Sequence, residues 1–216
     1  MSINQLHGKS FEDVIKASEN FRSSADGGRS NTAGFDIEAR FDRNSAIQIP
    51  TNIKTCKHND TGYSGVMLSD ARRFWSIDRD YRFLIGCWKQ IDKVKSFFRV
   101  YEMIMTTEGQ AKMLGSLPLT EVANFHDTLA AFPAGKEGQR QAQIFHREKR
   151  KQLYRKFDTC IKLEPKVDSK TQRRLQASVS ICVLKGFAKE FHVYDEAYSN
   201  IPLPFRLIST PRQFQV

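Results

Sequence analysis

Between residues 34 and 57 the chain alternates apolar and polar side chains, first over 35–42 and again over 47–54. Successive side chains of a β-strand point to opposite faces, so this period of two predicts two strands joined by a short loop. The odd positions form an apolar face that can be buried: Phe35, Ile37, Ala39, Phe41, Ile47, Ile49, Thr51 and Ile53. Four polar residues at even positions then share the opposite face: Asp36, Glu38, Asn52 and Lys54.

The rest of the chain predicts an α/β fold, with a central mixed β-sheet flanked by helices. Apolar runs at 81–88 and 95–106 are typical of central strands. Helical spacing of apolar residues and capping signals predict helices at about 10–22, 108–115, 119–131 and 137–157. Residues 162–170 are expected to form a loop, and alternation over 175–182 indicates a late strand, although a helix also fits there.

A chain of 216 residues with 40% hydrophobic side chains suits one domain, or one domain with a sizeable insertion. No apolar run is long enough for a membrane span, and the first residues lack the apolar region of a signal peptide. The four cysteines form no CxxC pair, so we expect reduced thiols in a cytosolic protein. Neither a P-loop nor a dinucleotide-binding fingerprint occurs, which argues against a nucleotide cofactor.

The charge of the chain indicates a polyanionic partner. Lys and Arg number 34 against 24 Asp and Glu, which gives a net charge of +10. Residues 136–174 hold much of this excess, with 13 Lys and Arg residues against 5 Asp and Glu residues. Between residues 147 and 156 the predicted helix carries six cations that either track a phosphate backbone or form a solvated face: Arg147, Lys149, Arg150, Lys151, Arg155 and Lys156.

Residues 168–176 concentrate the side chains that read base edges in DNA. Arg and Lys pair with guanine, Gln pairs with adenine, and Ser contacts either base. A plain polar turn is the alternative interpretation. The candidate DNA-binding residues of this segment are Ser169, Lys170, Gln172, Arg173, Arg174 and Gln176. Arg72 and Arg73 are further candidates, for contact with the DNA backbone.

The polar face of the predicted hairpin carries the candidate catalytic chemistry. Magnesium prefers oxygen ligands, and one or two carboxylates usually supply part of its shell. Asp36, Glu38 and Asn52 are therefore candidate ligands of Mg²⁺, and Lys54 could stabilise a pentacoordinate phosphorane. Bound metal lowers the pKa of its water, which favours hydrolysis of a phosphodiester. The alternative is a solvent-facing set of cross-strand pairs with no chemical role.

A helix, a Gly-Phe-Asp strand and a strand ending in Ile-Lys together resemble the PD-(D/E)xK nucleases, whose largest group is the type II restriction endonucleases. By this resemblance Asp36 matches the family aspartate and Lys54 the family lysine. Asn52 stands where a second acid is usual, so Glu38 could supply the missing carboxylate. Glu12, on the predicted first helix, matches a glutamate that joins the site in several branches.

The resemblance implies a restriction-endonuclease-like core, Mg²⁺ as cofactor, double-stranded DNA as substrate, a homodimer, and a location in the prokaryotic cytoplasm. We therefore expect one nuclease domain over residues 1–216, with the catalytic hairpin at about 34–57 and a basic DNA-contacting region at about 136–180. The predicted function is sequence-specific, Mg-dependent cleavage of double-stranded DNA. The alternatives are a structure-specific repair or junction nuclease, and a non-catalytic DNA-binding protein with a degenerate metal site.

Overall fold

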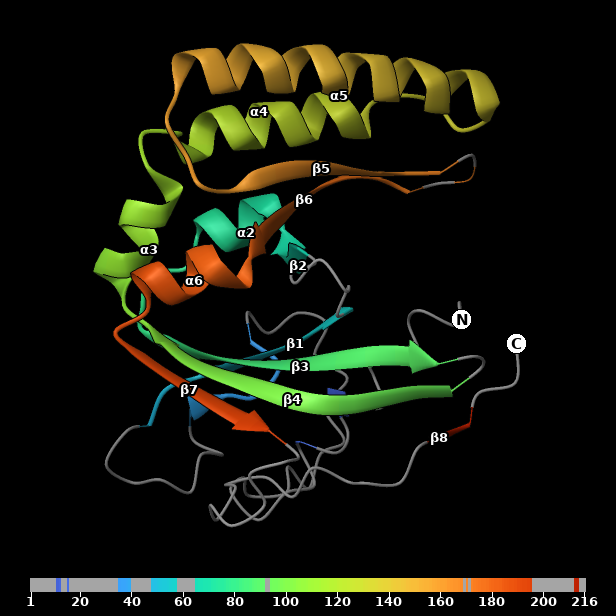
Figure 1. Cartoon of the computed structure of the whole chain (residues 1–216). Helices are drawn as coiled ribbons and strands as arrows, with labels where there is room; N and C mark the ends of the chain where they lie inside the picture. The colour runs from blue at the N-terminus through green and yellow to red at the C-terminus, as the bar shows by residue number, and fades with distance from the viewer. Residues whose placement is uncertain are drawn as a thin grey trace. The chain divides into compact units, whose positions relative to one another are not determined.

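The computed structural model of the chain describes residues 11–12, 15, 35–39, 48–57, 65–91, 94–168, 170, 172–195 and 212–213. The chain divides into two compact units that interleave along the sequence (Figure 1). Unit 1 comprises residues 1–64, 79–106 and 188–216, and unit 2 comprises residues 65–78 and 107–187. The predicted α/β class, with a mixed central sheet flanked by helices, is confirmed. A single domain over residues 1–216 stays a prediction.

Unit 1 contains the mixed sheet. Its strands are ordered β1-β3-β4-β7, and a short strand β8 also pairs with β4. Their bounds are Thr51–Lys57 (β1), Tyr81–Ile91 (β3), Val94–Met105 (β4), Glu190–Asp195 (β7) and Arg212–Gln213 (β8). The pairing of β1 with β3 is parallel, whereas β4 pairs in antiparallel fashion with β3 and with β7. The two central strands predicted from their apolar runs are therefore confirmed.

One face of this sheet builds a hydrophobic core. Side chains alternate between the two faces along each strand, and β1, β3 and β4 each contribute one apolar side chain to this face. These three side chains pack against three residues from the N-terminal part of the chain. The cluster is Phe11, Ile15, Ile37, Ile53, Leu84 and Val100. The Phe11 ring lies directly on Gly86 of β3, where an added Cβ would come within 2.7 Å of the ring. Glycine at this position therefore allows the helical segment to approach the sheet.

The predicted hairpin at 34–57 is only partly present. Residues 35–39 form no continuous strand, and their sheet contact is the isolated antiparallel bridge between Ile37 and Thr51. Residues 40–42, the end of the predicted first strand, lie outside the described residues. The second predicted strand begins at Thr51 rather than at residue 47, and its ladder is formed with β3. The buried apolar strand β3 offers β1 a longer partner than the local segment can, and this tertiary pairing overrides the hairpin pattern.

Unit 2 has a three-stranded antiparallel sheet ordered β2-β6-β5, with the strands Gly65–Asp70 (β2), Lys162–Val167 (β5) and Arg173–Ser180 (β6). Its helices are Ala71–Trp75 (α2), Thr107–Leu114 (α3), Leu119–Ala130 (α4), Lys136–Lys156 (α5) and Ile181–Phe187 (α6). Helices α4 and α5 lie side by side along the β5–β6 hairpin (Figure 1), and they contact β6 and β5 respectively. The helices predicted near 108–115, 119–131 and 137–157 are thus confirmed.

The predicted loop at 162–170 is wrong, because most of it forms strand β5. Pro165 obscures the strand pattern, since proline cannot donate a ladder hydrogen bond. It is tolerated here because β5 lies at the edge of the three-stranded sheet. The ambiguity between strand and helix at 175–182 is resolved by position, because β6 ends at Ser180 and helix α6 begins at Ile181.

His146 is a buried polar residue in the core of unit 2, with only 4% of its surface exposed. Its ring stacks on Phe125, with the ring centroids 5.4 Å apart. Its Nε2 lies 3.0 Å from the carbonyl oxygen of Leu163, to which it can donate. Burial lowers the pKa of His146 below its ordinary value of 6.5. The folded protein therefore holds this imidazole neutral at a pH where the unfolded chain binds a proton.

This arrangement predicts that unit 2 loses stability in mild acid. Above the unfolded pKa of about 6.5 the two states bind equal numbers of protons at His146, and below it the unfolded state binds more. As the pH falls below about 6.5, the extra proton that the unfolded state binds at His146 should lower the free energy of unfolding by up to about 1.4 kcal/mol per pH unit. Urea unfolding at several pH values should show a steeper acid slope for the wild type than for His146→Gln. Equal slopes would contradict the prediction.

Candidate active site and nucleic-acid interface

The candidate active site in unit 1 lies where the chain before β1 crosses the start of that strand. The backbone amides of Asp36 and Ile37 both donate to the Thr51 carbonyl at 3.0 Å, and the Thr51 amide donates to the Ile37 carbonyl at 2.8 Å. These three bonds hold Asp36 against β1. The sequence therefore positions an acidic residue beside the strand that carries Asn52 and Lys54.

Asp36 and Lys54 are in direct contact. The Asp36 Oδ2 accepts the backbone amide of Ile53 at 2.6 Å and the Lys54 ammonium at 2.9 Å. The same Lys54 Nζ donates to the Ile53 carbonyl at 3.0 Å. The two side chains keep 17% (Lys54) and 28% (Asp36) of their surface exposed, so the contact is accessible from solvent. The predicted proximity of Asp36 and Lys54 is thus observed, and their catalytic role stays a prediction.

The other candidate residues of this site differ in their surroundings. Asn52 lies on the same side of β1 as Lys54 and is 7% exposed. Glu38 is exposed, one residue beyond the bridge at Ile37. Glu12 belongs to the helical segment that packs on the opposite face of the sheet, the face of Ile53. Within the described part of the chain, no group of three or more His, Cys, Asp or Glu side chains is placed to hold a metal ion.

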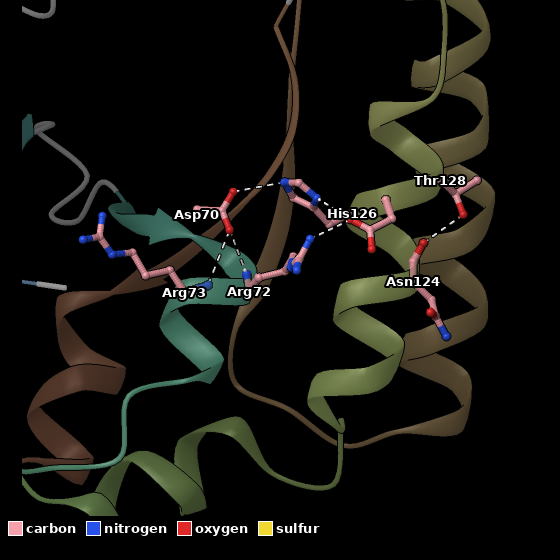
Figure 2. A network of polar contacts seen from close by, with 7 residues as sticks. Asp70, Arg72, Arg73, Asn124, His126 and Thr128 are labelled. Carbon is pink, nitrogen blue, oxygen red and sulfur yellow. Dashed lines mark hydrogen bonds and ion pairs between the residues drawn. The ribbon is translucent and has the colours of Figure 1, made fainter. Parts of the chain in front are cut away.

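In unit 2, Arg72 belongs to a network that begins at Asp70, where strand β2 ends and helix α2 begins (Figure 2). Asp70 caps α2 by accepting the amides of Arg72 and Arg73. Its other oxygen lies 3.2 Å from His126 Nε2, and His126 Nδ1 lies 3.3 Å from Asp127. Asp127 also pairs with Arg72 at 2.7 Å. Much of the positive charge of Arg72 is therefore compensated within the unit.

Arg73 points to the other side of α2, away from His126 (Figure 2). Its backbone is fixed by the Asp70 cap, and its side chain is half-buried. Its Nη2 is buried and has no hydrogen-bond partner among the described residues. The two arginines that the sequence offered as a pair for DNA contact thus have different surroundings.

The tip of the β5–β6 hairpin is built around two side chains. Asp168 accepts the amides of Lys170 at 2.9 Å and Gln172 at 3.0 Å. These hydrogen bonds from backbone amides, of which the one from Gln172 has the largest effect, lower the pKa of the Asp168 carboxyl. Arg173 is 8% exposed and donates to the carbonyls of Asp168, Gln172 and, at 2.7 Å, Pro133. Arg173 therefore fixes the hairpin from within, whereas the sequence proposed it as a DNA contact.

The exposed face of the hairpin carries an opposed pair of cations. Lys166 of β5 is the direct register partner of Arg174 of β6, and both are exposed. Like charges directly opposite each other destabilise a sheet, so this arrangement favours binding of an anion between or above them. Gln176, further along the same face, pairs with Glu164. Ser169 lies outside the described residues, and Lys170 and Gln172 are exposed near the tip.

Sequence reasoning missed Lys166 because Pro165 made its segment read as a loop. The signal that could have found it is the period of two in residues 162–167, where Leu163 is buried whereas Lys162 and Lys166 are exposed. Because side chains alternate along a strand, Lys162 and Lys166 lie on the same face of this edge strand, opposite the face of Leu163.

Helix α5 offers fewer uncompensated cations than its sequence indicates. Three acids form ion pairs with four of its six candidates: Glu121 contacts Lys149 and Lys156, Glu164 contacts Arg150, and Glu148 contacts Lys151, at 3.2 to 3.6 Å. Arg147 and Arg155 are exposed and show no ion pair within the described residues. They are therefore the strongest candidates on this helix for contact with phosphate.

Comparison with known proteins gives no match to a family model, to a curated protein or to a solved structure. Among the helices that the structure describes, none is long and apolar enough to cross a membrane. We therefore base the functional proposal on the contacts of Asp36 and Lys54 in unit 1 and on the exposed cations of unit 2.

The opposed cations give a prediction for nucleic-acid binding. Lys166→Ala combined with Arg174→Ala should weaken binding to double-stranded DNA, and the slope of log affinity against log salt should fall by about 0.9 for each phosphate that is no longer neutralised. Arg140→Ala is a matched control, since Arg140 is an exposed cation of unit 2 that already pairs with Glu137. Fluorescence anisotropy at several salt concentrations measures both quantities. An unchanged salt slope for the double variant would contradict the proposed binding of phosphate here.

Proposed function

We propose that this protein is a Mg-dependent endonuclease that cleaves double-stranded DNA at specific sequences, in the manner of a type II restriction enzyme. The observation that carries the proposal is the convergence of two oxygens on one cation. Asp36 Oδ2 and the Ile53 carbonyl lie 2.9 and 3.0 Å from Lys54 Nζ. A carboxylate and a carbonyl that already face one positive charge form a suitable donor pair for a small hard cation.

Asp36 and the Ile53 carbonyl would hold Mg²⁺, and the amide of Asn52 or the carboxylate of Glu38 would complete the protein ligands. When bound, Mg²⁺ lowers the pKa of a coordinated water and offsets charge on the scissile phosphate. The hydrogen bond from the Ile53 amide fixes the orientation of the Asp36 carboxylate. Because one carboxylate satisfies the minimum that magnesium sites usually show, the donor set fits a single ion.

Lys54 would supply the positive charge that stabilises the reacting phosphate. Its ammonium is held beside the candidate ligands by Asp36 and is 17% exposed, so a phosphate oxygen can reach it. A positioned ammonium stabilises the negative charge that develops on the phosphorane oxygens in the transition state. It can also orient the attacking water by donating a hydrogen bond to the water oxygen.

The exposed cations of unit 2 support DNA as the substrate. Lys166 and Arg174 on the hairpin, with Arg147 and Arg155 on α5, would contact phosphates. Lys170, Gln172 and Gln176 have the donors and acceptors needed to read base edges from the same hairpin. A homodimer, whose two active sites act on the two strands of a palindromic site, is part of the proposal.

A second candidate function is DNA binding without cleavage. It is favoured by the donor set of the site, in which Asn52 stands where the resemblance leads one to expect a second acid. Under this alternative, Asp36 and Lys54 form a structural ion pair, and the cations of unit 2 alone account for the function.

Incubation of purified protein with phage DNA in Mg²⁺, followed by sequencing of the fragment ends, tests the proposal. Discrete fragments whose ends share one sequence are expected. Ends at random positions, or intact DNA, would contradict a restriction activity. A parallel reaction with branched DNA identifies a junction nuclease if only that substrate is cut, and intact DNA in both reactions with retained binding identifies the non-catalytic alternative.

A further inference from the structure

Two buried cysteines of unit 1 lie in contact across the parallel β1–β3 pair. Cys56 and Cys87 are direct register partners in this ladder. Their Sγ atoms are 3.1 Å apart, and the residues are 5% and 4% exposed. Neither is in a disulfide. The other two cysteines, Cys160 and Cys182, are exposed.

The backbone geometry of this pair suits a covalent bond. Neighbouring strands lie about 4.8 Å apart, and disulfides occur at Cα separations of about 4.4–6.8 Å. The two sulfurs are 3.1 Å apart, and an S–S bond of about 2.05 Å requires them to approach by a further ~1 Å.

We propose that Cys56 and Cys87 are a redox-active pair that forms a reversible disulfide when the protein meets a peroxide. One thiol loses its proton and attacks an oxygen of hydrogen peroxide, the O–O bond breaks, and the sulfur becomes a sulfenic acid while the displaced hydroxide takes up that proton and leaves as water. The second sulfur then displaces the hydroxyl from the sulfenic sulfur and releases a second water. In total two S–H bonds are broken, one S–S bond forms, and the peroxide is reduced. A dithiol reductant reverses the bond by exchange.

A disulfide between Cys56 and Cys87 would lie close to the candidate active site along β1. Lys54 and Cys56 lie on the same side of β1, two residues apart. A disulfide at Cys56 would join the strand that carries Asn52 and Lys54 to β3. It therefore stabilises unit 1 against unfolding and fixes β1 in place. This inference does not rest on the proposed nuclease activity, because the bond depends only on the pairing of β1 with β3.

The test uses the full chain with Cys160→Ser and Cys182→Ser, which removes the two exposed thiols. After treatment with hydrogen peroxide, the protein is denatured, alkylated with iodoacetamide and weighed intact. We expect a mass lower by two hydrogen atoms, no alkylation, and reversal by dithiothreitol. The midpoint of thermal unfolding should rise by several degrees in the oxidised protein.

Added oxygen on either cysteine, or two thiols that remain open to alkylation, would overturn the proposal. The control is Cys56→Ser in the same background, which should show neither the loss of two hydrogens nor the thermal shift. Peptide mapping of the oxidised wild-type chain gives an independent readout. A cross-link between peptides containing residues 56 and 87 is expected, and a cross-link to residue 160 or 182 in its place would overturn the assignment.

Discussion

Replacing Lys54 by alanine is expected to lower the single-turnover rate of DNA cleavage at least about 100-fold, because a positioned cation at the reacting phosphate contributes on this scale. The affinity for DNA should change less than about two-fold, since the phosphate contacts that dominate affinity are expected elsewhere. The substitution leaves the Ile53 amide, which donates to Asp36 in the wild type, in place. Rapid-quench cleavage assays and fluorescence anisotropy measure the two quantities on the same DNA.

Lys57→Ala is the matched control for this experiment. Lys57 is the last residue of the same strand and is exposed, so its replacement removes an equal charge from β1 and leaves the ion pair between Lys54 and Asp36 intact. The control should cleave at the wild-type rate. Cleavage by Lys54→Ala at the rate of the wild type would contradict the role proposed for this lysine, whatever the control does.

Replacing Glu102 by alanine is expected to lower the free energy of unfolding by about 3–5 kcal/mol, because it removes the carboxylate that pairs with the buried Arg82 guanidinium. Arg82 Nε lies 2.9 Å from Glu102 Oε1, and the two side chains are only 8% and 14% exposed. The Tyr194 hydroxyl donates to the other oxygen of Glu102 at 2.6 Å. Burial and this carboxylate raise the pKa of Tyr194.

The double variant Arg82→Met with Glu102→Leu distinguishes the loss of stability caused by an unbalanced buried charge from the loss caused by missing packing contacts. Apolar replacement of both partners of a buried pair is often neutral or stabilising, so it should recover most of the stability that Glu102→Ala loses. Urea unfolding followed by circular dichroism gives both values. A loss below about 1 kcal/mol for Glu102→Ala would mean that solvent already screens Arg82 in the folded state.

The sheet of unit 1 was predictable where apolar side chains occupy both faces of a strand. Strands β3 and β4 follow long apolar runs, and the three long helices follow a helical period, so local pattern and burial agree there. The hairpin was predicted less well, because a period of two gives the faces of a strand but not its partner. Only the tertiary structure shows that β1 pairs along its length with β3, and that among the described residues the preceding segment meets β1 through Asp36 and Ile37.

The candidate active site followed from the same alternation of side chains. The contact between Asp36 and Lys54 was predictable, since both were assigned to the polar face opposite Ile37 and Ile53, which do enter the core. The burial of Asn52 was not predictable, because burial depends on what packs over a face.

The surroundings of the cations in unit 2 were likewise only partly predictable from the local sequence pattern. Arg173 and Arg174 are neighbours of identical type, yet one is buried and bonded to carbonyls while the other is exposed opposite Lys166. The period of two places Arg173 on the face of Leu175 and Ala177, but it does not give the residue that lies opposite Arg174 on the neighbouring strand. The opposed pair appears only when β5 and β6 are aligned.

The most direct test of the central proposal is a Mg²⁺ titration of supercoiled plasmid cleavage by the wild type and by Asp36→Asn, with a chelator as the zero point. The substitution keeps the size of the side chain and removes the charge that would hold the metal. The proposal predicts Mg-dependent linear product from the wild type and an intact plasmid with Asp36→Asn at every Mg²⁺ concentration. Equal cleavage by the two proteins, or an intact plasmid with both, would contradict it.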